Sequence, residues 1–256
     1  MTLFDTHVHL TDERFDADRQ AVIDNFEAEQ ILGVIEAATD EADSAAAVKL
    51  ACANARVYAA VGVHPHAAKD VSKDYVNILG RLADSQKVVA IGEIGLDYHY
   101  DFSPRDVQQA VFKAQIALAK DLKLPIIIHS REATKDMMDI LAAFAPLSGV
   151  VHCFSGSKET ALESIKLGLH VSFTGSLTFD NARKVQEAFI ALPMDRVMAE
   201  TDGPYLAPVP VRGKRNEPKY VRHVIEKMAA LRNMDADEVA KINIENAKAL
   251  FGVLGE

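Results

Sequence analysis

The amino-acid sequence predicts an α/β fold, a TIM-type (β/α)8 barrel that forms a single domain over residues 1–256. Eight short runs rich in β-branched residues alternate with longer, alanine-rich stretches of helical spacing. Near-continuous apolar strands that alternate with helices are typical of a parallel sheet covered by helices. The length of 256 residues suits a closed barrel of eight such units. An open doubly wound sheet is the alternative, but no Gly-X-Gly-X-X-Gly turn follows the first run.

The expected strands are residues 3–6, 32–37, 57–63, 88–94, 125–129, 150–154, 169–174 and 197–201. Two helices between or after them have recognisable starts. Ser103 is expected to cap a helix that has Pro104 at its first position, and apolar residues then follow helical spacing as far as Pro125. Asp235 and Glu238 resemble a capping box that opens a C-terminal helix.

Composition narrows the classes of function. The formal net charge of −9 argues against a broad basic surface that wraps nucleic acid, but it leaves room for a nucleic-acid substrate held locally. No apolar run approaches the roughly 20 residues that cross a bilayer, and the N-terminus has no signal-peptide pattern. The two cysteines, Cys52 and Cys153, fit a reducing cytosol, so we expect a cytoplasmic protein without membrane association. Nothing in the sequence indicates a protein partner.

Polar side chains follow most of the expected strands. His7 and His9 end the first run, and an extended chain places both on one side because its side chains alternate. Active sites of (β/α)8 barrels lie at the carboxyl ends of the strands. The polar residues at these ends include most of the nine histidines, and they are His7, His9, His64, His66, Glu93, His129, Arg131, His152, Glu200 and Asp202.

A metal site is the prediction that unites these strand ends. Its expected ligands are His7, His9, Glu93, His129, His152 and Asp202. Singly, a histidine such as His129 is more typical of a hydrogen-bonded core residue, but convergence of the whole set at one face favours metal binding. Glu93 has two oxygens and can bridge two cations, so the set predicts two divalent ions that lower the pKa of a shared water. Histidine and carboxylate ligands suit Zn, Mn, Fe or Co and, more weakly, Mg. Cys153 should point away from the side of His152 and pack.

With these motifs assembled, the chain closely resembles the TatD-type metal-dependent deoxyribonucleases, a branch of the amidohydrolase superfamily. The resemblance runs nearly end to end. Its blocks are Asp-Thr-His-Val-His at 5–9, Gly-Val-His-Pro-His at 62–66, Gly-Glu-Ile-Gly-Leu-Asp-Tyr at 92–98, His-Ser-Arg at 129–131, His-Cys-Phe-Ser-Gly at 152–156, Glu-Thr-Asp-Gly-Pro-Tyr-Leu at 200–206 and Arg-Gly-Lys-Arg-Asn-Glu-Pro at 212–218.

The resemblance implies a metal-dependent hydrolase barrel with a two-metal centre. One ion would be held by His7, His9, Glu93 and Asp202, and the other by Glu93, His129 and His152. Glu93 stands where many amidohydrolases have a carboxylated lysine. The implied reaction is hydrolysis of phosphodiester bonds at the ends of a DNA substrate, expected to be single-stranded or end-processed, with 3′-to-5′ exonuclease polarity.

We expect three residues to take catalytic roles beside the ions. Glu93 bridges, and Asp202 orients or deprotonates the nucleophilic water. His64 binds the phosphate or protonates the leaving oxygen, while His66 is an outer or surface residue. Phosphate contacts are expected from Arg212, Lys214 and Arg215, and from Arg131. Tyr98 and Tyr205 are candidates either for base stacking or for packing.

Two other functions fit parts of the pattern. A small-molecule amidohydrolase that acts on an amide, lactone or ester would use the same metal centre, but Glu93 in place of a lysine and the basic loop at 212–215 count against it. A non-catalytic partner protein that kept the barrel is the other, and the complete ligand set counts against that.

Overall fold

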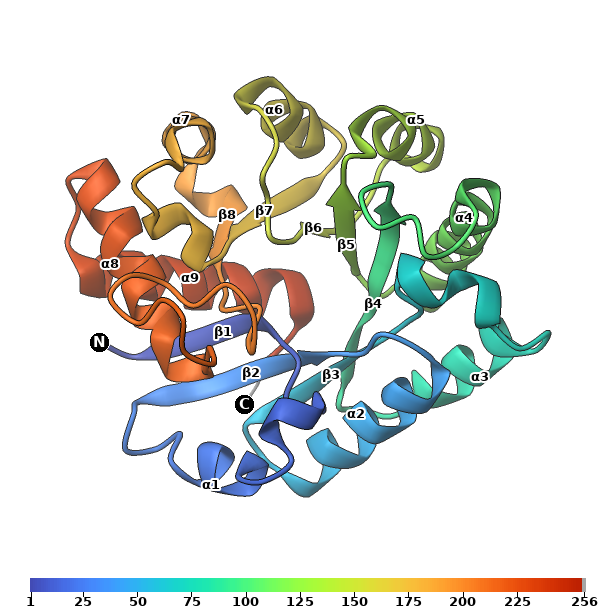
Figure 1. Ribbon diagram of the computed structural model, residues 1–256, viewed down its shortest axis with the longest axis horizontal. Helices are drawn as coiled ribbons and strands as arrows, with labels where there is room; N and C mark the ends of the chain where they lie inside the picture. Colours follow the sequence, from blue (N-terminus) through green and yellow to red (C-terminus); the bar gives the residue numbers. More distant parts are fainter. Residues whose placement is uncertain (255–256) are drawn as a thin grey trace.

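Eight parallel strands form a ring, each paired with its neighbours in chain order (Figure 1). The structure is a computed structural model that describes residues 1–254. All eight predicted strands are present, and the predicted single-domain TIM barrel is confirmed. The strands are β1 (Leu3–Val8), β2 (Ile31–Ala37), β3 (Val57–Val61), β4 (Val88–Asp97), β5 (Ile126–Arg131), β6 (Gly149–Val151), β7 (Leu169–Phe173) and β8 (Val197–Ala199).

Helices follow the strands and surround the ring (Figure 1). They are α1 (Arg19–Asp24), α2 (Glu41–Ala53), α3 (Tyr75–Leu82), α4 (Arg105–Leu122), α5 (Thr134–Phe144), α6 (Lys158–Lys166), α7 (Arg183–Ala191), α8 (Val221–Arg232) and α9 (Ala236–Phe251). Short 3-10 segments are η1 (Glu13–Phe15), η2 (Pro65–Asp70), η3 (Gly175–Thr178), η4 (Met194–Arg196) and η5 (Pro218–Tyr220). Within residues 1–254, no helix is long and apolar enough to span a bilayer.

Backbone and side chains together close the ring between the ends of β8 and β1. The backbone forms the bridge Val8–Gly203, and the Asp202 amide donates to the His7 carbonyl at 2.9 Å. The buried Asn243 amide of α9 donates to the Phe4 carbonyl at 2.9 Å and accepts from the Ala199 amide at 2.8 Å. The Asp5 carboxylate accepts from both the backbone amide and the hydroxyl of Thr201. These bonds fix the two strand ends that carry His7 and Asp202.

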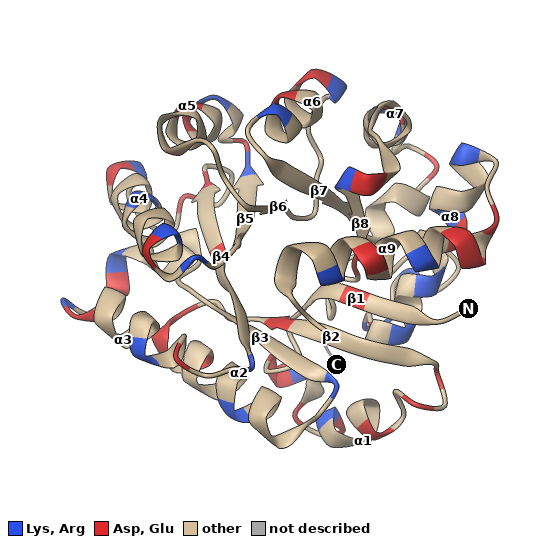
Figure 2. Ribbon diagram, turned by 180° about the vertical axis from the view of Figure 1, so that it is seen from behind, with Lys and Arg blue, Asp and Glu red and all other residues tan. Residues whose placement is uncertain are grey.

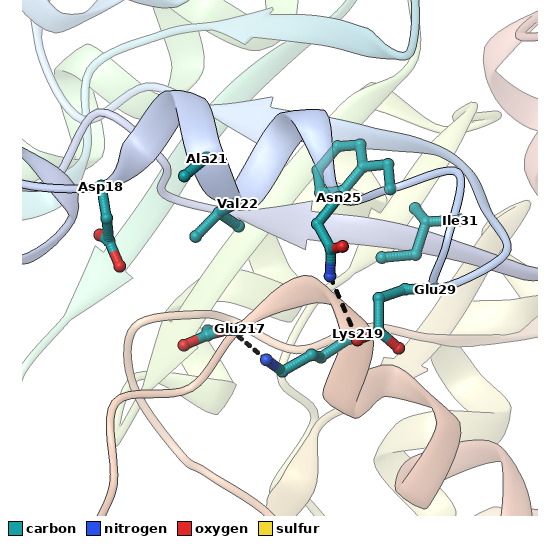
Figure 3. A pocket seen from close by; sticks show the side chains of 9 residues that line it. Asp18, Ala21, Val22, Asn25, Glu29, Ile31, Glu217 and Lys219 are labelled. Atoms are coloured by element: carbon teal, nitrogen blue, oxygen red, sulfur yellow. Dashed lines mark hydrogen bonds and ion pairs between the residues drawn. The ribbon is translucent and has the colours of Figure 1, made fainter.

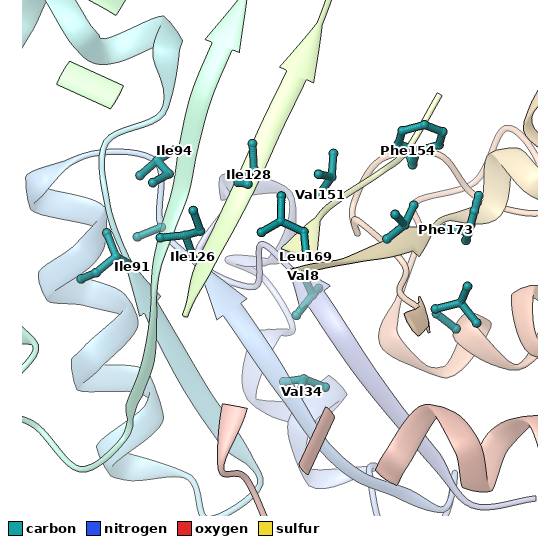
Figure 4. Packing of buried hydrophobic residues seen from close by; sticks show 14 of the residues in the cluster. Val8, Val34, Ile91, Ile94, Ile126, Ile128, Val151, Phe154, Leu169 and Phe173 are labelled. Carbon is teal, nitrogen blue, oxygen red and sulfur yellow. The ribbon is translucent and has the colours of Figure 1, made fainter. Parts of the chain in front are cut away.

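The apolar core has two layers. One fills the inside of the ring with side chains such as Phe4, Ile127 and Met198, and α9 covers its lower end with Ile244 and Phe251. Seen from behind, α9 lies across the ring beside β1 and β8 (Figure 2). The second layer lies between strands and helices and contains residues of every strand. Figure 4 shows part of it, including Ile91 of β4, Ile126 of β5 and Val151 of β6. With the lower end filled, the polar strand ends are left at the opposite mouth.

Two expected helix starts have different outcomes. The Asp235 carboxylate caps α9 by accepting from the amides of Asp237 and Glu238, as predicted. The cap predicted at Ser103 is wrong, because α4 begins at Arg105 and Pro104 holds the cap position. The buried Ser103 hydroxyl instead donates to the His66 carbonyl at 2.9 Å and accepts from the Lys69 amide. It therefore ties the start of α4 to the β3–α3 loop.

The residues that α4 buries also differ from those that its apolar spacing predicts. Among the apolar residues of that stripe, Val111 is buried, whereas Ala110 and Ala117 are exposed. Gln108 and Gln115 are buried instead. Their amide groups bond the backbone of strand ends, Gln108 at Asp97 and Gln115 at Val63. Polar contacts to loop backbone thus select the face of this helix.

A local irregularity in β4 aims its functional side chain. The β4–β5 register shifts between Ile91 and Ile94, so Glu93 lies in a bulge, which turns a side chain away from regular alternation. Gly95 pairs with His129 at a φ of +145°, and a Cβ there would lie 2.0 Å from the His129 carbonyl oxygen. A glycine is therefore required for β4 and β5 to bring Glu93 and His129 together.

Candidate metal centre

The six predicted ligand residues converge at the carboxyl-end mouth of the barrel. They come from β1 and its end (His7, His9), β4 (Glu93), β5 (His129), the end of β6 (His152) and the end of β8 (Asp202). All are buried except His129 and Asp202, which are partly exposed. The structure therefore brings together what the sequence placed at five separate strand ends.

Glu93 lies at the centre of this group, with its two oxygens facing opposite sides. Its Oε2 lies 3.3 Å from His7 Nε2 and 3.5 Å from His9 Nε2. Its Oε1 lies 2.8 Å from His129 Nδ1 and 2.7 Å from His152 Nε2. Only 2% of the residue is exposed, so its charge depends on these neighbours rather than on water.

The Oε2 side forms the first cluster. His7 Nε2 and His9 Nε2 are 3.2 Å apart, and Asp202 Oδ1 lies 3.7 Å from the former and 3.4 Å from the latter. The two histidines, two residues apart, point to the same side of the chain, as predicted, and their Nε2 atoms lie close together. Four nitrogen and oxygen atoms at such separations can all contact one cation of Zn or Mn size, whose bonds are about 2.0–2.2 Å long.

The Oε1 side forms the second cluster, and it includes one residue beyond the predicted set. His152 Nε2 lies 3.4 Å from His129 Nδ1. The buried His64 Nε2 also approaches Glu93 Oε1, at 3.5 Å, and groups with Glu93 and His129 at metal-ligand spacing. The prediction for His64 is a role on the substrate rather than on metal. The His66 amide donates to His64 Nδ1, which leaves the proton on Nε2 and favours that role despite the nearness of Glu93.

Outer hydrogen bonds orient two of these imidazoles. His9 Nδ1 donates to the Ala37 carbonyl at 2.7 Å, and His129 Nε2 donates to Asp97 Oδ2 at 3.2 Å. Each bond places the proton on the outer nitrogen and leaves the inner nitrogen to the cluster. This is the usual arrangement of metal-binding histidines, in which a carboxylate or carbonyl fixes the tautomer.

The cluster balances its charge internally when no cation is considered. Burial opposes ionisation of Glu93, but His152, His64 and His129 hold its pKa well below the ordinary value. Burial likewise opposes protonation of His9, but Asp202 and Glu93 raise its pKa to about 9. Protons on histidines thus compensate buried carboxylates, and a divalent cation would replace those protons.

These features fit divalent metal. Imidazole nitrogens and carboxylate oxygens from several strands face one another in a buried site. Without water, their lone pairs must be satisfied either by protons or by a cation. Within residues 1–254, three overlapping groups have ligand atoms within 4.8 Å of one another, namely His7–Glu93–His152, His7–His9–Asp202 and His64–Glu93–His129. Glu93 is shared by the first and third groups and His7 by the first and second, so the first group joins the Oε2 side to the Oε1 side.

Asp97 and Glu200 support the centre and were not assigned a role from the sequence. The buried Asp97 accepts from His66 Nε2 at 3.0 Å as well as from His129, and from the amides of His99 and Tyr100. Glu200 Oε1 lies 3.6 Å from His152 Nδ1. Both residues belong to the strand-end blocks of the sequence. Their closeness to a ligand, within four residues along the chain, was the sequence feature that could have predicted a supporting role.

The four predicted phosphate contacts differ in availability. Arg212 and Lys214 are exposed on the β8–α8 loop, with the Arg212 guanidinium over the Phe179 ring. Arg131 is exposed and lies over the Tyr100 ring at 4.8 Å. The Arg215 guanidinium instead pairs with Asp18 at 2.6 and 2.7 Å and with Glu217 at 3.1 Å. We therefore assign Arg215 to anchoring the loop.

A hollow of about 340 Å³ lies next to that anchor, between α1 and the Glu217–Lys219 segment (Figure 3). Asp18 and Glu217 point into it from its two walls, and Lys219 Nζ pairs with Glu217 at 2.9 Å. Its other lining residues are Ala21, Val22, Asn25, Phe26, Glu29 and Ile31. None of these belongs to the metal cluster, so the hollow is separate from the centre at the mouth.

Of the two candidate tyrosines, Tyr98 is held in a packed position. Its hydroxyl donates to Asp136 Oδ2 at 2.8 Å, and Arg105 covers its ring at 4.3 Å. Tyr205 is 45% exposed, and its ring centre lies 6.1 Å from that of His9. Cys153, for which packing is the prediction, has its Sγ 3.8 Å from the Thr174 hydroxyl.

A (β/α)8 barrel with a buried histidine–carboxylate cluster at the carboxyl-end mouth is the arrangement of a metal-dependent hydrolase. The chain belongs to the TatD related DNase family, whose model matches residues 4–252. The fold and the family together confirm the resemblance inferred from the strand-end blocks.

Relatives of the chain include both characterised and uncharacterised proteins. It is 45% identical to "Uncharacterized metal-dependent hydrolase YabD" of Bacillus subtilis, over 98% of this chain and 99% of the relative. It is 37% identical to "3'-5' ssDNA/RNA exonuclease TatD" of Erwinia amylovora, over 98% of this chain and all of the relative. The crystal structure of YjjV, a TatD homolog from Escherichia coli, superposes with a TM-score of 0.92 at 32% identity and covers 98% of both chains.

Removal of divalent metal is expected to lower the melting temperature. A ligand that binds only the folded state at about a hundredfold above its Kd adds about 2.7 kcal/mol. For a chain of this size, that corresponds to a shift of about 5–10 °C. The measurement is calorimetry of chelator-treated protein before and after addition of Zn, Mn or Mg, with elemental analysis of the bound ion.

Glu93→Gln should abolish most of that metal-dependent shift, because it replaces the shared carboxylate with a neutral amide of similar shape. Glu226→Gln is the matched control, since Glu226 also pairs with a histidine, His223, but on the outer face of α8. A full metal-dependent shift in Glu93→Gln would contradict the central role of this carboxylate.

Proposed function

We propose that the protein is a metal-dependent nuclease that hydrolyses phosphodiester bonds at the ends of single-stranded DNA or RNA, with 3′-to-5′ polarity. The observation that carries the proposal is the pair of ligand clusters on the two oxygens of Glu93. His7, His9, Glu93 and Asp202 would hold one divalent ion, and Glu93, His129 and His152 the other. Ions at these positions would supply Lewis-acid stabilisation of the phosphate and lower the pKa of water between them.

Asp202 is our candidate to accept the proton of the nucleophilic water. Its side chain is 13% exposed, so its carboxylate reaches both the cluster and the open mouth. We assign it to orient the attacking water and accept its proton as the water oxygen bonds to phosphorus. The bond from phosphorus to the leaving oxygen then breaks, and that oxygen takes up a proton.

His64 is the candidate to meet the phosphate or the leaving oxygen. Its Nδ1 accepts from the His66 amide at 3.2 Å, which places a proton on Nε2. That Nε2 faces the Oε1 side of Glu93. As a hydrogen-bond donor there, His64 would bind a phosphoryl oxygen or the leaving oxygen as it departs.

Local cations offset the acidic character of the protein as a whole. Acidic and basic segments are interspersed over the helices of the barrel, consistent with the net charge of −9 (Figure 2). Arg212 and Lys214 on one loop and Arg131 on another are the proposed phosphate contacts. The exonuclease name of the Erwinia amylovora relative supports both the substrate class and the polarity.

Metal-loaded protein is expected to shorten single-stranded oligonucleotides from the 3′ end. Glu93→Gln should lower kcat/KM by at least about a hundredfold, because it disrupts both clusters at once. The measurement is gel analysis of 5′-labelled DNA and RNA, run beside a panel of lactones, amides and carboxylic esters. Glu226→Gln serves as the control.

Two results would contradict the proposal. Cleavage of the panel without cleavage of either nucleic acid would identify a small-molecule amidohydrolase. An equal turnover of every substrate by wild type and Glu93→Gln would indicate that the measured activity does not come from this centre.

The basic loop should contribute through charge. The double variant Arg212→Ala/Lys214→Ala is expected to raise KM for oligonucleotides and to reduce the dependence of log KM on log salt by about 1.4, at about 0.7 for each single-strand phosphate contact. The control, Lys49→Ala/Lys113→Ala, removes the same charge from exposed positions on α2 and α4. Equal salt slopes for the two double variants would exclude a phosphate contact at this loop.

A further inference from the structure

Two exposed aromatic rings stand together on the loop between β4 and α4. Tyr100 is 47% exposed and Phe102 is 55% exposed. Their ring centres are 5.3 Å apart and their planes differ by 27°, so they stack on each other. We call this pair the Tyr100–Phe102 platform. Exposed apolar surface at the mouth of a site indicates a binding function more often than isolated exposed residues do.

The platform adjoins the metal centre through one histidine. His66 places its ring edge-on against both members, with ring centres 5.3 Å from Tyr100 and 4.8 Å from Phe102. Its ring centre is 4.3 Å from that of His64. His64 in turn faces Glu93. A substrate group on the platform would therefore lie one side chain away from the cluster.

A cation stands beside the platform. The Arg131 guanidinium covers the Tyr100 ring at 4.8 Å and is exposed to solvent. Among the described residues it forms no ion pair with a carboxylate. A flat, unsaturated surface next to an available guanidinium matches the two chemical parts of a nucleotide, which are the base and the phosphate.

We propose that the Tyr100–Phe102 platform stacks a nucleobase of the substrate strand while Arg131 binds an adjoining phosphate. The inference rests on the proposed nuclease function and specifies how that site holds its substrate. Stacking is tolerant of sequence because every base has a π-face. The platform therefore favours unpaired strands, whose bases are free to leave their neighbours, over duplex.

The test combines a substitution in the protein with one in the substrate. Phe102→Leu keeps an apolar side chain but removes the aromatic face. Metal-loaded full-length protein is assayed on a short 5′-labelled single-stranded DNA and on the same strand with one abasic residue, moved through the terminal positions. Ile190→Ala, at a similarly exposed position on α7, is the control.

Phe102→Leu is expected to lower kcat/KM about tenfold on the intact strand. That loss should shrink for the substrate whose abasic residue falls on the platform, because the base that stacks is already missing. Ile190→Ala should match wild type on every strand. A loss of the same size on all substrates, intact or abasic, would overturn the proposal, and so would no loss at all.

The platform and the nuclease function can fail separately. If wild type cleaves no strand, the proposed function is overturned, and the platform is then tested by fluorescence anisotropy with the same labelled DNA. Weaker binding by Phe102→Leu than by wild type, reduced for one abasic position, would support the platform. Equal binding by the two proteins would exclude it.

Discussion

The carboxylate of Glu93 is the constraint on which the site depends. It is almost fully buried, and a buried charge is costly unless opposite charges or hydrogen-bond donors surround it. Four side chains from three other strand ends meet that need, two on each oxygen. The bulge in β4 aims the carboxylate at them, and Gly95 lets β4 approach His129. A buried charge, a bulge and a glycine each weaken an ordinary strand. Here they together form a site with ligand atoms on both oxygens of Glu93.

The surroundings of Glu93 explain why polar residues occupy places where a barrel usually packs apolar ones. Asp97 orients His129 and also holds His66, and the Ala37 carbonyl orients His9. Asn243 and Asp5 close the ring at the strands that carry His7 and Asp202. α9 fills the opposite end of the barrel, so apolar packing and metal chemistry are separated along its axis.

The sequence was sufficient for the fold and for the convergence of the ligands, because strand order and strand-end chemistry follow from period and spacing. It was insufficient where the partner of a side chain lies on a distant segment or on a loop whose path the sequence does not predict. Ser103 was predicted to cap α4, but its hydroxyl bonds the β3–α3 loop. The basic run predicts Arg215 as a phosphate contact, but its guanidinium pairs with Asp18, which is distant in the sequence. His64 could not be assigned to the cluster because its approach to Glu93 depends on loop geometry. Tyr100 and Phe102 carry no motif, and the role we propose for them rests on their exposure and on their neighbours.

The central claim is that one carboxylate joins two cation sites. An anomalous-scattering map of crystals grown with Mn or Zn tests it most directly, since the map gives the number, identity and ligands of the ions together. The account predicts two peaks, one beside Glu93 Oε2 with His7, His9 and Asp202, and one beside Glu93 Oε1 with His129 and His152. A single peak that does not contact Glu93, or two peaks away from this carboxylate, would contradict it.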